Sequence, residues 1–151
     1  MKLSSAIGGG IAGAVALTLI HETLRRISSD APRMDLLGME AIAKSLEGID
    51  ASVPKEDKLF KITMAGDLLS NSIYYSLAGF GSEKKAIVRG ALSGLAAGIG
   101  AVYLPKPLGL NEAPANRTLQ TKLMTVALYF TGGVVAGITG RLLENKRHYE
   151  R

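Results

Sequence analysis

Charged residues are distributed very unevenly along this chain, and their distribution constrains the fold more than any other feature. Four long stretches are nearly free of charge, and Lys, Arg, Asp and Glu crowd the segments between them. A helix rises 1.5 Å per residue, so about 20 apolar residues cross the hydrocarbon core of a bilayer. The sequence therefore predicts an all-α, polytopic membrane protein that forms one domain over residues 1–151. Its four transmembrane helices are expected at residues 3–26, 60–80, 86–104 and 119–140.

Glycine placement also favours lipid as the solvent. The chain has 18 glycines, and they cluster inside the apolar stretches. An interior glycine costs a water-soluble helix roughly 1 kcal/mol relative to alanine, whereas in a membrane it lets neighbouring helices approach closely. Residues four apart share one helix face, so regular glycine spacing predicts packing faces, used either within the chain or against another copy or subunit. The glycines with this spacing are Gly9, Gly13, Gly90, Gly94, Gly98, Gly133 and Gly137.

The first apolar stretch has a second interpretation, a secretory signal peptide. Lys2 precedes it, and Ala14-Val15-Ala16 has the pattern of a cleavage site. The apolar run continues past that site to Ile20, however. This continuation favours a membrane helix that is retained.

The connection after the first stretch contains a predicted amphipathic helix over residues 32–47. Its apolar residues recur at helical spacing, and acidic and basic residues occupy much of the remainder. The segment is too short and too charged to cross a bilayer. It is expected to lie at the membrane interface or across the end of the bundle, and the alternative is a surface that docks a partner.

The second expected span is unusually polar. Asp67 and Asn71 are four residues apart and share one helix face, and His21 and Glu22 end the first span in the same half of the membrane. With Lys122 they form a candidate intramembrane cluster of His21, Glu22, Asp67, Asn71 and Lys122. Either this cluster is a structural hydrogen-bond network, the interpretation that we favour here, or it binds a proton or cation.

Basic residues at the ends of the spans predict the orientation. Four spans place both termini on one side, and the density of Lys and Arg beside the spans is higher there, which predicts cytoplasmic termini. Arg89 and Arg141 lie on that side and are expected to reach lipid headgroups. The general pattern is typical of a bacterial inner-membrane protein.

The two halves of the chain also resemble each other. Residues 9–17 resemble residues 90–98, and residues 74–79 resemble residues 129–133, in the same order. A duplicated two-helix hairpin would explain this order and would imply a pseudo-twofold axis along the membrane normal. Chance likeness between apolar helices of low complexity is the alternative.

Several functional classes lack their sequence motifs. The chain has no cysteine, which excludes thiolate catalysis and Cys-based metal sites. His21-Glu22 lacks the second histidine of a zinc peptidase, and no phosphate-binding loop or nucleophile elbow is present. We therefore expect no catalytic residues, metal or cofactor. The net charge of +5 lies in short clusters at span ends, which argues against nucleic-acid binding.

Two functions are compatible with these features. The first is a non-enzymatic membrane protein that acts by helix packing, as a self-assembling unit or as an accessory subunit of a membrane complex. Its partners would be the lipid bilayer and other copies or subunits. The alternative is a small transporter or channel for protons, ions or a small solute, with a polar site around Asp67 and Asn71.

Overall fold

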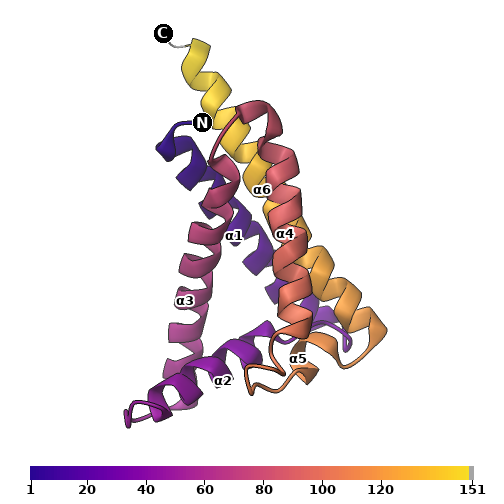
Figure 1. Cartoon of the computed structure of the whole chain (residues 1–151). Coiled ribbons are helices and arrows are strands. Elements are labelled where there is room, and N and C mark those ends of the chain that lie inside the picture. Colours follow the sequence, from indigo (N-terminus) through magenta and orange to yellow (C-terminus); the bar gives the residue numbers. More distant parts are fainter. Residues whose placement is uncertain (150–151) are drawn as a thin grey trace.

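The structure, a computed structural model, describes residues 1–149 of the chain. These residues are helical apart from turns and loops, so the all-α prediction is confirmed (Figure 1). Two 3-10 turns, η1 (Leu77–Gly79) and η2 (Glu83–Lys85), connect the third and fourth helices. The α-helices are α1 (Leu3–Ile27), α2 (Met34–Glu47), α3 (Glu56–Ser76), α4 (Ala86–Tyr103), α5 (Ala113–Asn116) and α6 (Leu119–Tyr149).

Three helical segments in the described chain are long and apolar enough to cross a membrane: Leu3–Ile27, Glu83–Tyr103 and Leu119–Lys146. The prediction of four such spans is wrong, because α3 does not qualify. Its first turn carries Glu56 and Asp57, and polar side chains continue along it through Asp67 and Asn71 to Ser76. The helix predicted around residues 60–80 is present, but its composition is too polar for a span of its own.

The long helices pack in the order α3, α1, α6, α4. α1 lies between α3 and α6, and α6 lies between α1 and α4. The two chain ends lie at the same end of this bundle, and α2 crosses the opposite end (Figure 1). The position of α2 matches the expectation that the amphipathic segment lies across the end of the bundle.

Glycine holds α6 against its two neighbours. Gly13 of α1 faces the backbone of Gly132, and Gly90 of α4 faces the backbone of Gly133. A methyl group added at either position would overlap the backbone of the opposing helix. All the glycines predicted to pack do contact another helix of the same chain, and these are Gly9, Gly13, Gly90, Gly94, Gly98, Gly133 and Gly137.

A small core forms where α1, α3 and α6 meet. Tyr75 of α3 is completely buried among Ala14, Leu17 and Ala136. Its hydroxyl donates a 2.9 Å hydrogen bond to the backbone oxygen of Tyr129. This bond fixes α3 to α6 across α1.

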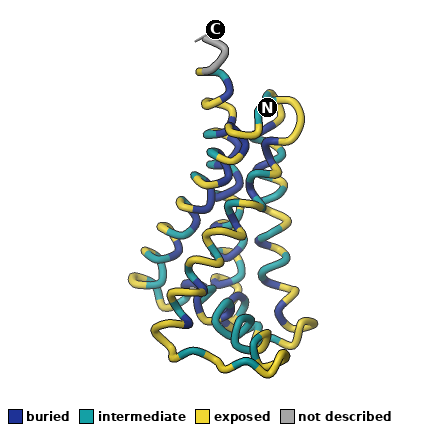
Figure 2. Tube along the Cα trace, turned by 90° about the vertical axis from the view of Figure 1, so that its left-hand side faces the viewer, coloured by how far each residue is buried: buried dark blue, intermediate teal, exposed yellow. Residues whose placement is uncertain are grey.

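Large apolar side chains lie mostly on the outside of the bundle. Leu92 and Leu123 are 61% exposed and Ile73 is 62% exposed, and exposed residues recur along every long helix in Figure 2. Glycine and alanine line much of the interior contact between the helices instead, together with a few larger side chains such as Tyr75 and Val102. Exposed apolar surface on this scale is typical of a protein that lipid surrounds.

The packing is not twofold symmetric. In a duplicated hairpin the α3–α4 contact would be equivalent to the α1–α6 contact. α1 and α6 pack together along their length, whereas α3 and α4 meet only near η1. The duplication therefore stays a prediction, and any symmetry is broken between α3 and α4.

The glycine contacts lead to a test with a matched control. Gly133→Ala should lower the melting temperature in mild detergent by an amount equivalent to about 1–3 kcal/mol, because the new methyl group overlaps the Gly90 carbonyl. At Gly66 of α3, an added methyl group would have nothing within 4 Å. Gly66→Ala should therefore stabilise the helix by about 0.5–1 kcal/mol. Equal effects of the two substitutions would contradict this packing.

Candidate functional site

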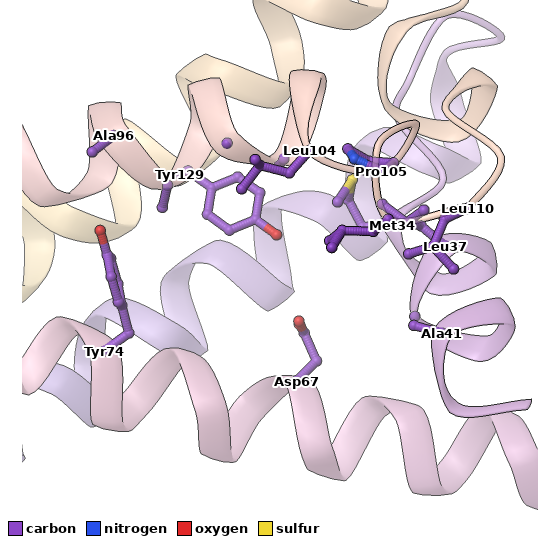
Figure 3. A pocket seen from close by; sticks show the side chains of 15 residues that line it. Met34, Leu37, Ala41, Asp67, Tyr74, Ala96, Leu104, Pro105, Leu110 and Tyr129 are labelled. Carbon is purple, nitrogen blue, oxygen red and sulfur yellow. The ribbon is translucent and has the colours of Figure 1, made fainter. Parts of the chain in front are cut away.

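A cleft lies between α3 and α4, in the half of the bundle nearer to α2 (Figure 3). Its volume is about 520 Å³. α3 and α4 form its sides, Tyr129 of α6 forms its back, and α2 and the segment after α4 close one end. The lining residues are Met34, Leu37, Gly38, Ala41, Asp67, Tyr74, Ala96, Ala97, Gly100, Ala101, Leu104, Pro105, Leu108, Leu110 and Tyr129.

One hydrogen bond ties α4 to α3 at the edge of the cleft, and a second ties α4 to η1. The Tyr74 hydroxyl donates to the backbone oxygen of Ser93 at 2.9 Å. Nearer the chain termini, Arg89 Nε donates to the backbone oxygen of Ala78 at 2.9 Å. From these bonds the two helices diverge toward α2 (Figure 1). Small side chains on α4, at Ala97 and Ala101, leave the space between them open.

Two polar groups point into this otherwise apolar space, the carboxylate of Asp67 and the hydroxyl of Tyr129 (Figure 3). Asp67 is half-buried. Its Oδ1 accepts a 3.0 Å hydrogen bond from Asn71 Nδ2. Among the described residues, neither Asp67 Oδ2 nor the Tyr129 hydroxyl has a hydrogen-bond partner. The cleft therefore offers two unsatisfied oxygen atoms to a ligand.

His21 is a neighbour of Asp67 that does not itself line the cleft. A void of about 10 Å³ separates the two residues, close to the lower limit for one water molecule. The imidazole is only 4% exposed. Its Nε2 lies 3.0 Å from the Pro32 backbone oxygen and 3.4 Å from the Met34 nitrogen. The shorter contact favours a proton on Nε2 that is donated to Pro32, and it ties α1 to the start of α2.

The structure brings together only part of the expected cluster. His21, Asp67 and Asn71 are neighbours. Glu22 lies at the margin: its Oε1 is 3.7 Å from His21 Nδ1, but the carboxylate accepts two 2.7 Å hydrogen bonds from Arg25. The side chain of Lys122, on α6, makes no hydrogen bond or ion pair within the described chain. Neither Glu22 nor Lys122 joins Asp67 at the cleft, because the rotation of each helix turns its side chain to other surroundings.

A second polar network was not predicted from the sequence. Asp35, one of the acidic residues of the predicted amphipathic helix, is only 4% exposed. Arg33 Nη2 donates to its Oδ2 at 2.7 Å, and Arg25 Nη1 lies 3.8 Å from the same oxygen. The Arg25 guanidinium also lies over the ring of Phe60, 5.7 Å from its centre. The one available signal was a carboxylate in the first turn of a helix, a favourable position.

The charge on Asp35 is held by these arginines. Burial by itself opposes ionisation of the carboxyl group. The hydrogen bond from Arg33, together with the positive charges of Arg33 and Arg25, outweighs burial and holds the pKa of Asp35 below its usual value. This carboxylate is therefore ionised and satisfied, and it contributes to stability.

The expected contact of Arg89 and Arg141 with lipid headgroups stays a prediction, and the described residues show how Arg89 is held within the chain. Its guanidinium is bound to η1 through the Ala78 carbonyl, and its Nη2 is buried without a hydrogen-bond partner. Arg141 is exposed on α6. No group of three or more His, Cys, Asp or Glu side chains in the described chain is placed to hold a metal ion.

Comparison with known protein families, with curated proteins and with solved structures gave no match. The site is therefore interpreted from its own residues and geometry.

The Asp35 network predicts how stability depends on pH. The pKa of Asp35 is lowered in the folded state, so its contribution to stability is present above the ordinary value of about 3.9 and is lost as the pH falls through the folded-state pKa. Asp35→Asn should lower stability at pH 7 by about 1–3 kcal/mol, because Arg33 loses a charged partner. The free energy of unfolding of this variant should also fall less than that of the wild type when the pH is lowered.

Thermal unfolding at pH 7 and pH 3 measures both effects. Glu47→Gln is the control, because Glu47 is exposed at the last residue of α2, at the opposite end of that helix from Asp35. A variant at Asp35 whose stability follows the wild-type pH profile would contradict a role for this ion pair.

Proposed function

We propose that this protein is a small integral membrane transporter whose solute binds in the α3–α4 cleft, with Asp67 as the charged group of the site. The observation that carries the proposal is the half-buried Asp67 carboxylate, which faces an open cleft with one oxygen unpaired. Ionisable residues within membrane bundles are expensive and mark solute or ion pathways.

The partial pairing of Asp67 favours a binding role over a structural one. Polar atoms of a structural network pair mainly with other groups of the chain, whereas the unpaired atoms here border an open cleft. Asn71 pairs with only one carboxylate oxygen, and the Tyr129 hydroxyl nearby is also free among the described residues. Both groups point into a space large enough for a solute. A ligand, rather than the protein, would complete their hydrogen bonds.

Assembly with other copies or subunits has less support. That hypothesis rested on the glycine faces and on the amphipathic segment. The glycines pack within the chain, and α2 lies against α3 and α5. The outward surface of the apolar helices carries many large apolar side chains, which lipid can cover without a protein partner.

The proposal also includes a location. We place the protein in a bacterial inner membrane with both termini cytoplasmic, since the termini share one end of the bundle and the basic side chains beside the apolar helices are denser at that end. The cleft then lies in the half of the membrane away from the cytoplasm.

Substitution of Asp67 tests transport directly. Asp67→Asn keeps the shape of the side chain and removes its charge, so it should slow proton flux into proteoliposomes by about tenfold or more. The flux is followed with an entrapped pH-sensitive dye under an imposed gradient. Asp57→Asn, on the same helix but exposed outside the cleft, should behave as wild type. Equal flux for the wild type, Asp67→Asn and empty liposomes would exclude proton coupling at this site.

The oligomeric state separates transport from assembly. Because the glycine faces are occupied within the chain, the protein in mild detergent should have the mass of one 15.9 kDa chain plus its micelle. Light scattering combined with size exclusion measures this mass. A stable oligomer, or a membrane subunit that co-purifies in fixed ratio, would favour the assembly hypothesis instead.

A further inference from the structure

The cleft has the chemistry of a site for a particular class of solute. We propose that it binds an amphipathic amine, a molecule with a hydrocarbon body and a protonated amino group that pairs with Asp67. The inference rests on the proposed function, since it names the solute of the same site. It is carried by the size of the cleft, by its charge and by the direction in which it opens.

The size of the cleft excludes a helix and fits a small molecule. Its volume of about 520 Å³ lies within the range of roughly 300–1,000 Å³ that is typical of small-ligand sites. A membrane helix, about 10 Å across with its side chains, needs far more room. The walls are apolar side chains from α2, α4 and the segment after α4, which suit a hydrocarbon body.

The charge of the cleft favours a cation. Asp67 is the charged residue among the 15 that line the cleft, and none of these is Lys, Arg or His. An ionised carboxylate only accepts hydrogen bonds, whereas an ammonium group donates three. Asp67 Oδ2 and the Tyr129 hydroxyl, both free among the described residues, can accept two of them. An anionic headgroup would meet the carboxylate with no compensating positive charge.

The cleft does not suit a divalent metal ion. Ca²⁺ and Mg²⁺ are held by about six or more oxygen ligands. The described lining residues supply the oxygens of one carboxylate and of the hydroxyls of Tyr74 and Tyr129, and the Tyr74 hydroxyl is already bonded to Ser93. An organic cation needs fewer polar contacts, because its apolar part is satisfied by the walls.

The direction of the opening explains how such a solute would arrive. α2 and the segment after α4 close the cleft at one end, and the Tyr74–Ser93 bond closes it at the other. The side between α3 and α4, opposite Tyr129 of α6, is open, and the segment after α4 that closes the end beside it carries the exposed apolar residues Leu104 and Leu108. This side faces the lipid in a membrane. An amphipathic amine already partitioned into the bilayer would enter sideways, with its amino group directed toward Asp67.

Three ten-carbon compounds with different headgroups test the proposal: decylamine, decanol and decanoate. Saturable binding of each radiolabelled compound is measured with the protein in lipid nanodiscs, after subtraction of binding to nanodiscs without protein. Wild-type protein and the control Asp57→Asn should bind decylamine with the same affinity. Asp67→Asn should bind it about tenfold or more weakly, because a desolvated charge pair is lost. Decanoate should not bind saturably.

A second variant tests the location without touching the charge. Ala97 lines the cleft on α4, and Ala97→Phe should fill part of the space and reduce decylamine binding about tenfold or more, as overpacking predicts. Thermal unfolding of each variant shows that it is folded. If decanol binds as tightly as decylamine, or if neither variant weakens binding, the proposal is overturned.

The outcomes distinguish this inference from the proposed function. If decylamine does not bind saturably but proton flux depends on Asp67, the ligand is not an amphipathic amine, and the proposed transport function is still supported. If decylamine binds saturably and its binding depends on Asp67, but neither protons nor decylamine cross the membrane, the amine site is supported and the proposed transport function is contradicted.

Discussion

Direct backbone contact between α6 and its two neighbours is the constraint on which the rest of the structure depends. Glycine on both sides of α6 lets α1 and α4 approach until backbone meets backbone, which gains dispersion and Cα–H···O contacts that larger side chains would prevent. With α1 and α4 fixed on α6, α3 can pack on the remaining face of α1. It then stands across from α4 with only η1 and Tyr74 to connect them. The cleft is the space that this order of helices leaves.

Much of this fold could be predicted because helical periodicity identifies faces. The four-residue spacing of glycine identified the packing faces, and Asp67 and Asn71 were expected on one face of one helix. The sequence does not determine how each helix is rotated against its neighbours. Glu22 follows His21 directly, yet it pairs with Arg25 while His21 turns toward Pro32. The burial and ion pairing of Asp35 were not predicted for the same reason. Its contacts with Arg33 and Arg25 depend on how α2 is oriented against α1, which the sequence does not show.

The cleft itself could not have been predicted. Ala96, Ala97, Gly100 and Ala101 follow the same small-residue pattern as the glycines that pack against α6. In sequence the two faces of α4 are nearly alike, but one is covered by a helix and the other lines open space. The predicted number of spans, four, was wrong because α3 is too polar to count as a span. One of the polar residues that lower its hydropathy, Asp67, is also the charged residue of the cleft.

Asp35 and Asp67 both line the void beside His21, but they differ in how they are satisfied, and this difference separates stability from function. Asp35 is held by two arginines, which lower its pKa and keep it charged. Asp67 has one amide partner on one oxygen. A carboxylate in apolar surroundings with a single amide partner costs stability. That cost has a physical explanation if a cationic solute completes the site.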